Sequence, residues 1–322
     1  MNLSAETHNP PKTWKRTALQ TLLHYGGSAL VLLLLFRFLP GRQVLRALVS
    51  LPARLWLLVL IGYFAAHCIG VSKWRLMVNL AGAGLSVPQA ARCYLAGLFG
   101  SLLLPSLIGG DLVRATLALR FGRSKAGVLL GSFLDRWLDF GVLTLLAGVG
   151  AVLVPGALSP RNRRIFLLLG LVALAAAAGV AALLTLLPVK RFSYYWRRHM
   201  VRVRRAARSM GQRPGAVVGA LSLGILAQIA FISLSVRLAE ACGLYLPFRV
   251  WIFAWPLAKL SGALPITQGG IGVREAALVA LLLPFGAPAV LTVASGLAWE
   301  AIVVTGALVA GLTSLLMGRF QA

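Results

Sequence analysis

The amino-acid sequence predicts an all-α polytopic membrane protein, with about six full spans and two re-entrant broken helical hairpins that form an inverted repeat. The 322 residues are 59% hydrophobic and only 12% charged, whereas a soluble domain carries about 25% charged residues. Apolar blocks such as 166–187 and 287–316 are long enough to cross a hydrocarbon core of about 30 Å. These blocks do not alternate apolar and polar residues, which favours helices over a β-barrel.

Six segments are predicted as full spans, and two further apolar stretches are interrupted. The full spans lie near residues 20–39, 55–72, 126–154, 163–187, 214–242 and 287–316. The stretches 96–119 and 250–283 contain proline and paired glycines, which break helices. Irregular backbone at membrane depth is tolerated only inside protein or beside a water-filled cavity. Each interrupted stretch therefore predicts a hairpin of two short half-helices.

The distribution of basic residues predicts the orientation of the chain. With a cytoplasmic N-terminus, 20 of the 32 Lys and Arg lie in cytoplasmic segments, 8 in outer segments and 4 within apolar stretches. This asymmetry follows the positive-inside rule, so both termini are expected in the cytoplasm. Residues 1–19 lack a signal-peptide cleavage site and are expected to form a cytoplasmic tail. Residues 20–322 are expected to form a single transmembrane domain, with a basic cytoplasmic segment at 188–213.

The formal charge of +25 could by itself indicate nucleic-acid binding. Because most basic residues flank apolar blocks, membrane topology explains the charge, and no nucleic-acid partner is expected. The basic segment is interpreted either as a surface helix that recognises anionic lipid headgroups or as a cytoplasmic loop. The three cysteines show no paired spacing, so no disulfide framework, metal site or cofactor is predicted.

One motif, Pro-x-x-x-Gly-Gly-x-x-x-Arg, occurs twice in the chain. The first copy runs from Pro105 to Arg114 and the second from Pro265 to Arg274, 160 positions later. This displacement is about half the chain and predicts an internal repeat, with halves at about 55–154 and 214–316. Three predicted spans separate the copies, so the two hairpins should enter from opposite sides. Such paired interruptions in corresponding halves are typical of a transporter's binding site.

The break in each copy predicts a site for an anionic group. A new helix should begin after each Gly-Gly pair, with its free N–H groups facing the gap. Glycines allow a ligand to approach the backbone, and an Arg one turn later can bind a phosphate in bidentate fashion. Tight turns and interface anchors are the alternative reading of these residues. The predicted substrate-binding residues are Arg114, Arg274, Gly109, Gly110, Gly269, Gly270 and Lys259.

The chain has seven acidic residues, and all except Glu6 lie in or beside apolar segments. A charged group at the bilayer centre costs about 2.5–3.5 kcal/mol on insertion scales, so these residues should face the bundle interior. Asp135 and Asp139 are four apart and share one helix face. A charge network or proton relay is expected, with purely structural pairing as the alternative. Its predicted members are Asp111, Asp135, Arg136, Asp139, Glu275 and Glu300.

These motifs resemble the flippase-like family, which is the transmembrane region of bacterial lysylphosphatidylglycerol synthases and their stand-alone relatives. The resemblance extends from about residue 20 to 316. The residues that carry it are Gly109-Gly110-Asp111 with Arg114, Asp135-Arg136, and Pro265 with the run Gly270-Ile271-Gly272-Val273-Arg274-Glu275. Where the first family motif often continues into Glu-Arg, this chain has Asp135-Arg136.

The resemblance implies lipid translocation between leaflets of the bacterial inner (plasma) membrane. Full-length synthases add a soluble aminoacyl-transferase domain, which is not expected in a chain that ends at Ala322, so no lysyl transfer to lipid is expected. Some stand-alone relatives are associated with hopanoid or glycolipid pathways, which leaves the substrate open.

We therefore expect a lipid flippase or transporter rather than an enzyme, with no catalytic residues. It would move a phospholipid or other anionic or zwitterionic membrane lipid through a midplane cavity between the hairpins, and a homo-oligomer is compatible with the sequence. The alternative is an integral-membrane enzyme acting on a lipid phosphate or polyprenyl carrier, with the carboxylates as general acid or base. Against an enzyme, His24 and His67 are expected to lie away from the acids, and no metal-ligand spacing occurs. A third reading is a scaffold for a lipid-pathway complex.

Overall fold

The computed structural model describes residues 51–103, 107–154, 212–262 and 270–319, together with the single residues 42, 45, 46, 49, 164 and 201. Every regular element in this part of the chain is helical. The helices are α3 (Ala53–Leu80), α4 (Val87–Leu103), α5 (Leu107–Phe121), α6 (Lys125–Leu153), α9 (Pro214–Ala241), α10 (Phe248–Ser261), α11 (Val273–Leu282), the 3-10 helix η3 (Leu283–Phe285) and α12 (Ala289–Arg319).

Four of these helices, α3, α6, α9 and α12, are long and apolar enough to cross a membrane. They are candidate membrane spans, and they coincide with the predicted spans at 55–72, 126–154, 214–242 and 287–316. Helix α3 is longer than its predicted span, because it continues to Leu80. The predicted spans at 20–39 and 163–187, the tail at 1–19 and nearly all of the basic segment 188–213 lie outside the described residues.

The interrupted apolar stretches form pairs of short helices, as the sequence predicted. Helix α4 packs against α5, and α10 packs against α11. In the first pair, α5 already begins at Leu107, so Gly109 and Gly110 lie inside its first turn. The expectation that a helix begins after this Gly-Gly pair was wrong, because a helix tolerates glycine at a cost of only about 1 kcal/mol per residue.

In the second pair, a new helix does begin after the glycines. Helix α11 starts at Val273, directly after Gly270 and Gly272, whose φ angles are 82° and 86°. Only glycine adopts such angles without a steric penalty. The chain is therefore non-helical at this point, and the N-terminus of α11 is formed by the end of the motif.

The second half of the chain repeats the helix order of the first, with α9 to α12 corresponding to α3 to α6. The same turn ends α3 and α9. Gly82 and Gly243 have φ angles of 90° and 89°. In both turns the glycine N–H donates to the carbonyl three residues back, and the next N–H donates to the carbonyl five residues back. This pattern caps a helix C-terminus with a left-handed glycine, so the repeat extends well beyond the Pro-Gly-Gly-Arg motif.

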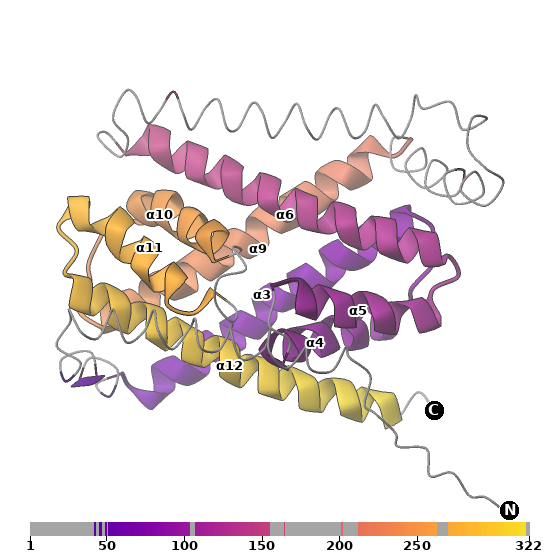
Figure 1. Cartoon of the computed structure of the whole chain (residues 1–322), viewed down its shortest axis with the longest axis horizontal. Helices are drawn as coiled ribbons and strands as arrows, with labels where there is room; N and C mark the ends of the chain where they lie inside the picture. Colours follow the sequence, from indigo (N-terminus) through magenta and orange to yellow (C-terminus); the bar gives the residue numbers. More distant parts are fainter. Residues whose placement is uncertain are drawn as a thin grey trace, which may run out of the picture.

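The two halves run in opposite directions. Helices α3 and α9 pack against each other, and Gly62 near the start of α3 lies against Leu234 near the end of α9. Gly224, nearer the start of α9, lies against Lys73 farther along α3. These contacts show that the two corresponding helices are antiparallel. In Figure 1, α4 and α5 accordingly lie toward one end of the long helices, and α10 and α11 toward the other.

Each short-helix pair packs against the last long helix of the other half. Helix α4 packs against α12, and α10 packs against α6. The Ser314 hydroxyl of α12 donates to the Arg92 carbonyl of α4 at 3.0 Å. A Cβ at Gly150 of α6 would lie only 2.4 Å from the backbone nitrogen of Phe253 on α10. The halves are thus interlocked, with glycines at the closest helix approaches.

The buried apolar core lies between the halves. Its largest cluster joins residues of α3, α6, α9, α10, α11 and α12, including Tyr63, Phe231, Trp255 and Ile302. Large apolar side chains also cover the outside of the long helices: Leu58 of α3, Phe133 of α6 and Leu312 of α12 are all exposed. An apolar exterior on helices of this length is expected for a bundle surrounded by lipid.

Close packing at Gly131 gives a first prediction. A Cβ at this position on α6 would lie 2.5 Å from the Cα atom of Val78 on α3, so Gly131→Leu should force the helices apart. Overpacking typically costs about 1–3 kcal/mol, and we expect a clear drop in the midpoint of thermal unfolding of the purified protein. Gly141→Leu on the same helix is the matched control, because no described residue outside its own turn of α6 lies within 4 Å of the added Cβ. Equal melting temperatures for the two variants would contradict this packing.

Candidate functional site

A cavity of about 450 Å³ lies between the two halves. The first copy of the repeated motif contributes Gly110, Asp111 and Arg114 to its wall, and the second contributes Ile271 and Arg274. Side chains of α3, α4, α6, α9, α10 and α12 complete the wall. Two segments 160 residues apart in sequence therefore face one shared space.

Charged side chains of the first half form a connected cluster on one side of the cavity. Lys73 of α3 is its centre: its Nζ lies 2.7 Å from Asp135 Oδ1 and 2.8 Å from Asp139 Oδ1. The two aspartates lie one turn apart on α6 and face the same cation, as their spacing predicted. Lys73 and Asp135 are buried, with side-chain exposures of 5% and 2%.

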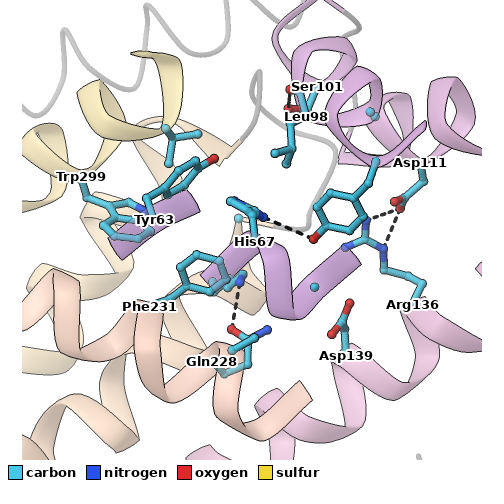
Figure 2. A pocket seen from close by; sticks show the side chains of 18 of the residues that line it. Tyr63, His67, Leu98, Ser101, Asp111, Arg136, Asp139, Gln228, Phe231 and Trp299 are labelled. Atoms are coloured by element: carbon cyan, nitrogen blue, oxygen red, sulfur yellow. Dashed lines mark hydrogen bonds and ion pairs between the residues drawn. The ribbon is translucent and has the colours of Figure 1, made fainter. Parts of the chain in front are cut away.

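The same cluster includes both arginines of the first half. Arg114 Nη2 lies 3.0 Å from Asp111 Oδ1 and 3.5 Å from Asp135 Oδ2. Arg136 Nε donates to Asp111 Oδ2 at 2.7 Å, and its Nη2 also pairs with this carboxylate. Figure 2 shows Asp111 and Arg136 facing each other across this side of the pocket, with Asp139 nearby. Three cations and three carboxylates thus balance one another inside an apolar bundle.

Arg114 has two further features. Its guanidinium lies over the rings of Trp74 and Tyr94, at 4.8 and 5.2 Å from their centroids. Its Nε is buried without a hydrogen-bond acceptor among the described residues. A buried donor without an acceptor is uncommon in native proteins, so this N–H is a group that a ligand oxygen could satisfy.

The second half has a smaller charge cluster around Arg274. Arg274 Nη2 lies 2.8 Å from Glu275 Oε1 and 2.8 Å from Glu300 Oε2. Glu275 is fully buried, and its Oε2 accepts a 2.6 Å hydrogen bond from the Gly272 N–H. Because this N–H is one of the free donors at the start of α11, Glu275 acts as a cap of the helix.

The two charge clusters contain the same type of ion pair. In each half the motif arginine reaches a carboxylate on the next long helix, from Arg114 of α5 to Asp135 of α6 and from Arg274 of α11 to Glu300 of α12. The predicted charge network therefore exists as two separate sets of ion pairs. Whether any member carries protons stays a prediction.

Lys259 occupies a different environment on the opposite side of the cavity. Its Nζ donates to Gln228 Oε1 at 3.0 Å and lies 5.0 Å from the ring centroid of Phe231 and 4.8 Å from that of Trp255. No carboxylate in the described segments forms an ion pair with it. Trp299 packs against both rings, at 5.9 and 6.2 Å between centroids. Phe231, Trp255 and Trp299 are called the aromatic wall below.

His67 lies between the first charge cluster and the aromatic wall (Figure 2). Its Nδ1 is 3.3 Å from the Tyr94 hydroxyl, and it lines the cavity together with Asp111, Asp135 and Asp139. The contacts of His67 in the described part of the chain are with Tyr94 and with the rings of Tyr63 and Phe231, so the expectation that it lies away from the acids stays a prediction. Within the described ranges, no three His, Cys, Asp or Glu side chains are grouped as metal ligands.

Most predicted site residues reach the cavity. Those in its wall are Gly110, Asp111, Arg114, Asp135, Arg136, Asp139, Lys259, Arg274 and Glu300. Gly109, Gly270 and Glu275 are not part of the wall, and Gly269 lies outside the described residues.

The motif glycines also have a packing role. A Cβ at Gly110 would lie 2.6 Å from the Gly97 carbonyl oxygen, and one at Gly270 would lie 2.7 Å from the Gly262 Cα. They therefore allow each pair of short helices to approach closely. A role in ligand approach stays a prediction.

Sequence reasoning missed several residues of the cavity. Lys73 was not among the predicted site residues, yet α3 continues past it and buries it beside the aspartates. Tyr63, His67, Tyr94, Gln228 and the aromatic wall were also missed. One signal was present: His67 and Gln228 are separated by 161 positions, the same offset as Gly82 and Gly243, and both line the cavity.

Comparison with known proteins identifies the family. The chain matches the family described as "Lysylphosphatidylglycerol synthase TM region" over residues 21–311. Because this match covers most of the 322 residues, the chain belongs to that family. It matches none of the curated proteins with which it was compared. Membership indicates a multi-pass membrane protein with a lipid-related function.

The ion pairs around Arg274 give a second prediction. Arg274→Met would leave Glu275 and Glu300 buried without their cation, and breaking a buried pair from one side costs about 3–5 kcal/mol. We expect a large fall in the thermal unfolding midpoint, and partial recovery in the double variant Arg274→Met with Glu300→Gln, because one stranded charge is removed. Arg237→Met is the control, since its pair with Glu240 is exposed and worth little. Strictly additive effects of the two substitutions would contradict coupling between Arg274 and Glu300.

Proposed function

We propose that this protein is a lipid flippase or transporter, and that it moves a phospholipid or other anionic or zwitterionic lipid headgroup between leaflets. The observation that carries the proposal is the cavity between the halves. It is lined by five cationic side chains inside a bundle of membrane-crossing helices: Lys73, Arg114, Arg136, Lys259 and Arg274. A space of about 450 Å³ with charged side chains in its wall, within such a bundle, suits a headgroup, while the acyl chains stay in the surrounding lipid.

We further propose that α4–α5 and α10–α11 are re-entrant hairpins entering from opposite sides. Three features support this: the antiparallel halves, the short helices, and the position of each pair against the last helix of the other half. Binding sites at the interface of inverted repeats are typical of transporters, because rocking of one half against the other changes which side of the site is open.

The distribution of charge supports an inner-membrane protein with cytoplasmic termini. The end of the bundle formed by the α3–α4 and α5–α6 connections and by the end of α12 contains Arg75, Arg92, Arg120, Arg123, Lys125 and Arg319. The opposite end contains Arg54, Arg237 and Arg249, together with Glu240. A more basic end faces the cytoplasm under the positive-inside rule. The C-terminus follows α12 directly and would lie on that side.

In this proposal the motif arginines bind headgroup oxygens. Arg114 offers its Nε, which has no acceptor among the described residues. Arg274 would exchange a carboxylate contact for a phosphate oxygen. The acids that pair with these arginines would keep them charge-balanced when no lipid is bound, which limits the cost of a cationic cavity in an apolar bundle. They are Asp111, Asp135, Glu275 and Glu300.

A scrambling assay in proteoliposomes tests this function. We expect wild-type protein to expose fluorescent phospholipid of the inner leaflet to an external quencher, and the Arg114→Ala, Arg274→Ala double variant to lose at least 90% of the rate. The single variant Arg237→Ala lies outside the cavity and should scramble at the wild-type rate. Wild-type rates in the double variant would refute the assignment of the arginines. Covalently modified lipid in the same vesicles, detected by mass spectrometry, would instead support the alternative of an enzyme acting on a lipid phosphate or polyprenyl carrier.

A further inference from the structure

We infer that the Lys259 ammonium is the anchor for the phosphate oxyanion of the transported headgroup; this inference rests on the proposed function. It assigns the first contact of the anion to the aromatic side of the cavity rather than to the motif arginines.

Nearly all carboxylates of the protein already have a cation. Of the seven acids, Glu6 alone lies outside the described residues. The other six each form an ion pair with Lys73, Arg114, Arg136, Arg237 or Arg274. Lys259 lines the cavity, and no carboxylate of the described residues forms a direct ion pair with it. An anion from outside the protein can form such a pair.

The surroundings of Lys259 hold the ammonium in place without neutralising it. Gln228 provides one neutral acceptor at 3.0 Å, and the rings of Phe231 and Trp255 provide cation–π contacts. Lys259 is in the last turn of α10, where helix carbonyls also favour a cation. An ammonium makes three hydrogen bonds, and Gln228 accepts one of them. Among the described residues no other acceptor contacts the ammonium, so two donors are open there to an oxyanion in the cavity.

The internal repeat does not duplicate the Lys259 site in the first half of the chain. The position 161 residues before Lys259 is Leu98, which also lines the cavity but carries no charge. Conversely, the position 161 residues after Lys73 is Leu234. The first half therefore has an added lysine, Lys73, which is already paired with two aspartates. The second half has an added lysine, Lys259, which has no ion-pair partner among the described residues. A monoanionic group such as a lipid phosphodiester matches this one charge.

A binding experiment with three probes tests the anchor. The full chain, delipidated in a neutral detergent, is titrated with short-chain phosphatidylglycerol, with diacylglycerol of the same chain length, and with inorganic phosphate, and ligand-induced thermal shifts are measured. We expect phosphatidylglycerol to bind and the other two probes not to bind. Lys259→Gln should weaken the binding of phosphatidylglycerol at least tenfold, whereas Lys259→Arg should stay within about threefold of the wild-type affinity. Arg237→Gln is the control and should match the wild-type affinity. Equal affinity of wild type and Lys259→Gln would overturn the anchor. A Lys259-dependent shift with inorganic phosphate at the same concentration would overturn the lipid source and indicate a free-anion site.

The stability of the ligand-free protein provides a second, independent readout. Lys259→Met removes a half-buried cation that has no ion-pair partner among the described residues, so its melting temperature should equal or exceed that of wild type. Lys73→Met is the matched control, because it strands Asp135 and Asp139 and should melt at a clearly lower temperature. A fall for Lys259→Met as large as that for Lys73→Met would overturn the claim that Lys259 lacks an ion-pair partner.

Scrambling assays separate this inference from the proposed function. Wild-type transport that persists unchanged in Lys259→Gln would overturn the anchor and leave the flippase function standing. Lys259-dependent phosphatidylglycerol binding without any wild-type scrambling would support the anchor and overturn the flippase function.

Discussion

The pairing of buried charges inside an apolar bundle is the constraint on which the rest of this structure depends. Taking an ion out of water costs several kcal/mol unless a partner and hydrogen bonds compensate. Arg114 and Arg274 therefore need carboxylates, and they find them on the helices that follow, α6 and α12. These contacts fix the positions of the short helices α5 and α11 relative to the long ones, so the walls of the cavity follow from electrostatics as much as from apolar packing.

Close packing at glycines is the second feature that holds the helices together. In lipid, burying apolar side chains yields little, and helices associate through close contact and hydrogen bonds instead. Gly131 and Gly150 bring α6 against α3 and α10, while Gly110 brings α5 against α4. Because each short-helix pair packs against the last helix of the other half, both halves contribute to both ends of the cavity. The transport function proposed above would use such a shared site.

The two sides of the cavity differ in how their cations are paired, and this difference bears on the proposed function. One side holds three cations and three carboxylates in mutual contact, so its net charge is close to zero and attracts an anionic ligand only weakly. The other side holds Lys259 against the aromatic wall, where rings replace a counter-ion. A lipid headgroup that passes between them would exchange one type of contact for the other. The family of lysylphosphatidylglycerol synthase transmembrane regions, to which the chain belongs, is consistent with such a lipid-related role.

The sequence by itself determined part of the fold and which two segments face the cavity. Composition and apolar block lengths predicted four helices that the structure contains, and the duplicated motif predicted the two segments that meet at the cavity. The tertiary structure decided which residues of different helices meet, and local sequence patterns do not contain this information. Lys73 is an ordinary flanking lysine in sequence, and becomes the partner of Asp135 and Asp139 only because α3 continues past it and packs against α6. Likewise, the absence of a carboxylate beside Lys259 is a property of distances between α9, α10 and α6, and a pattern along one chain carries no information about those distances.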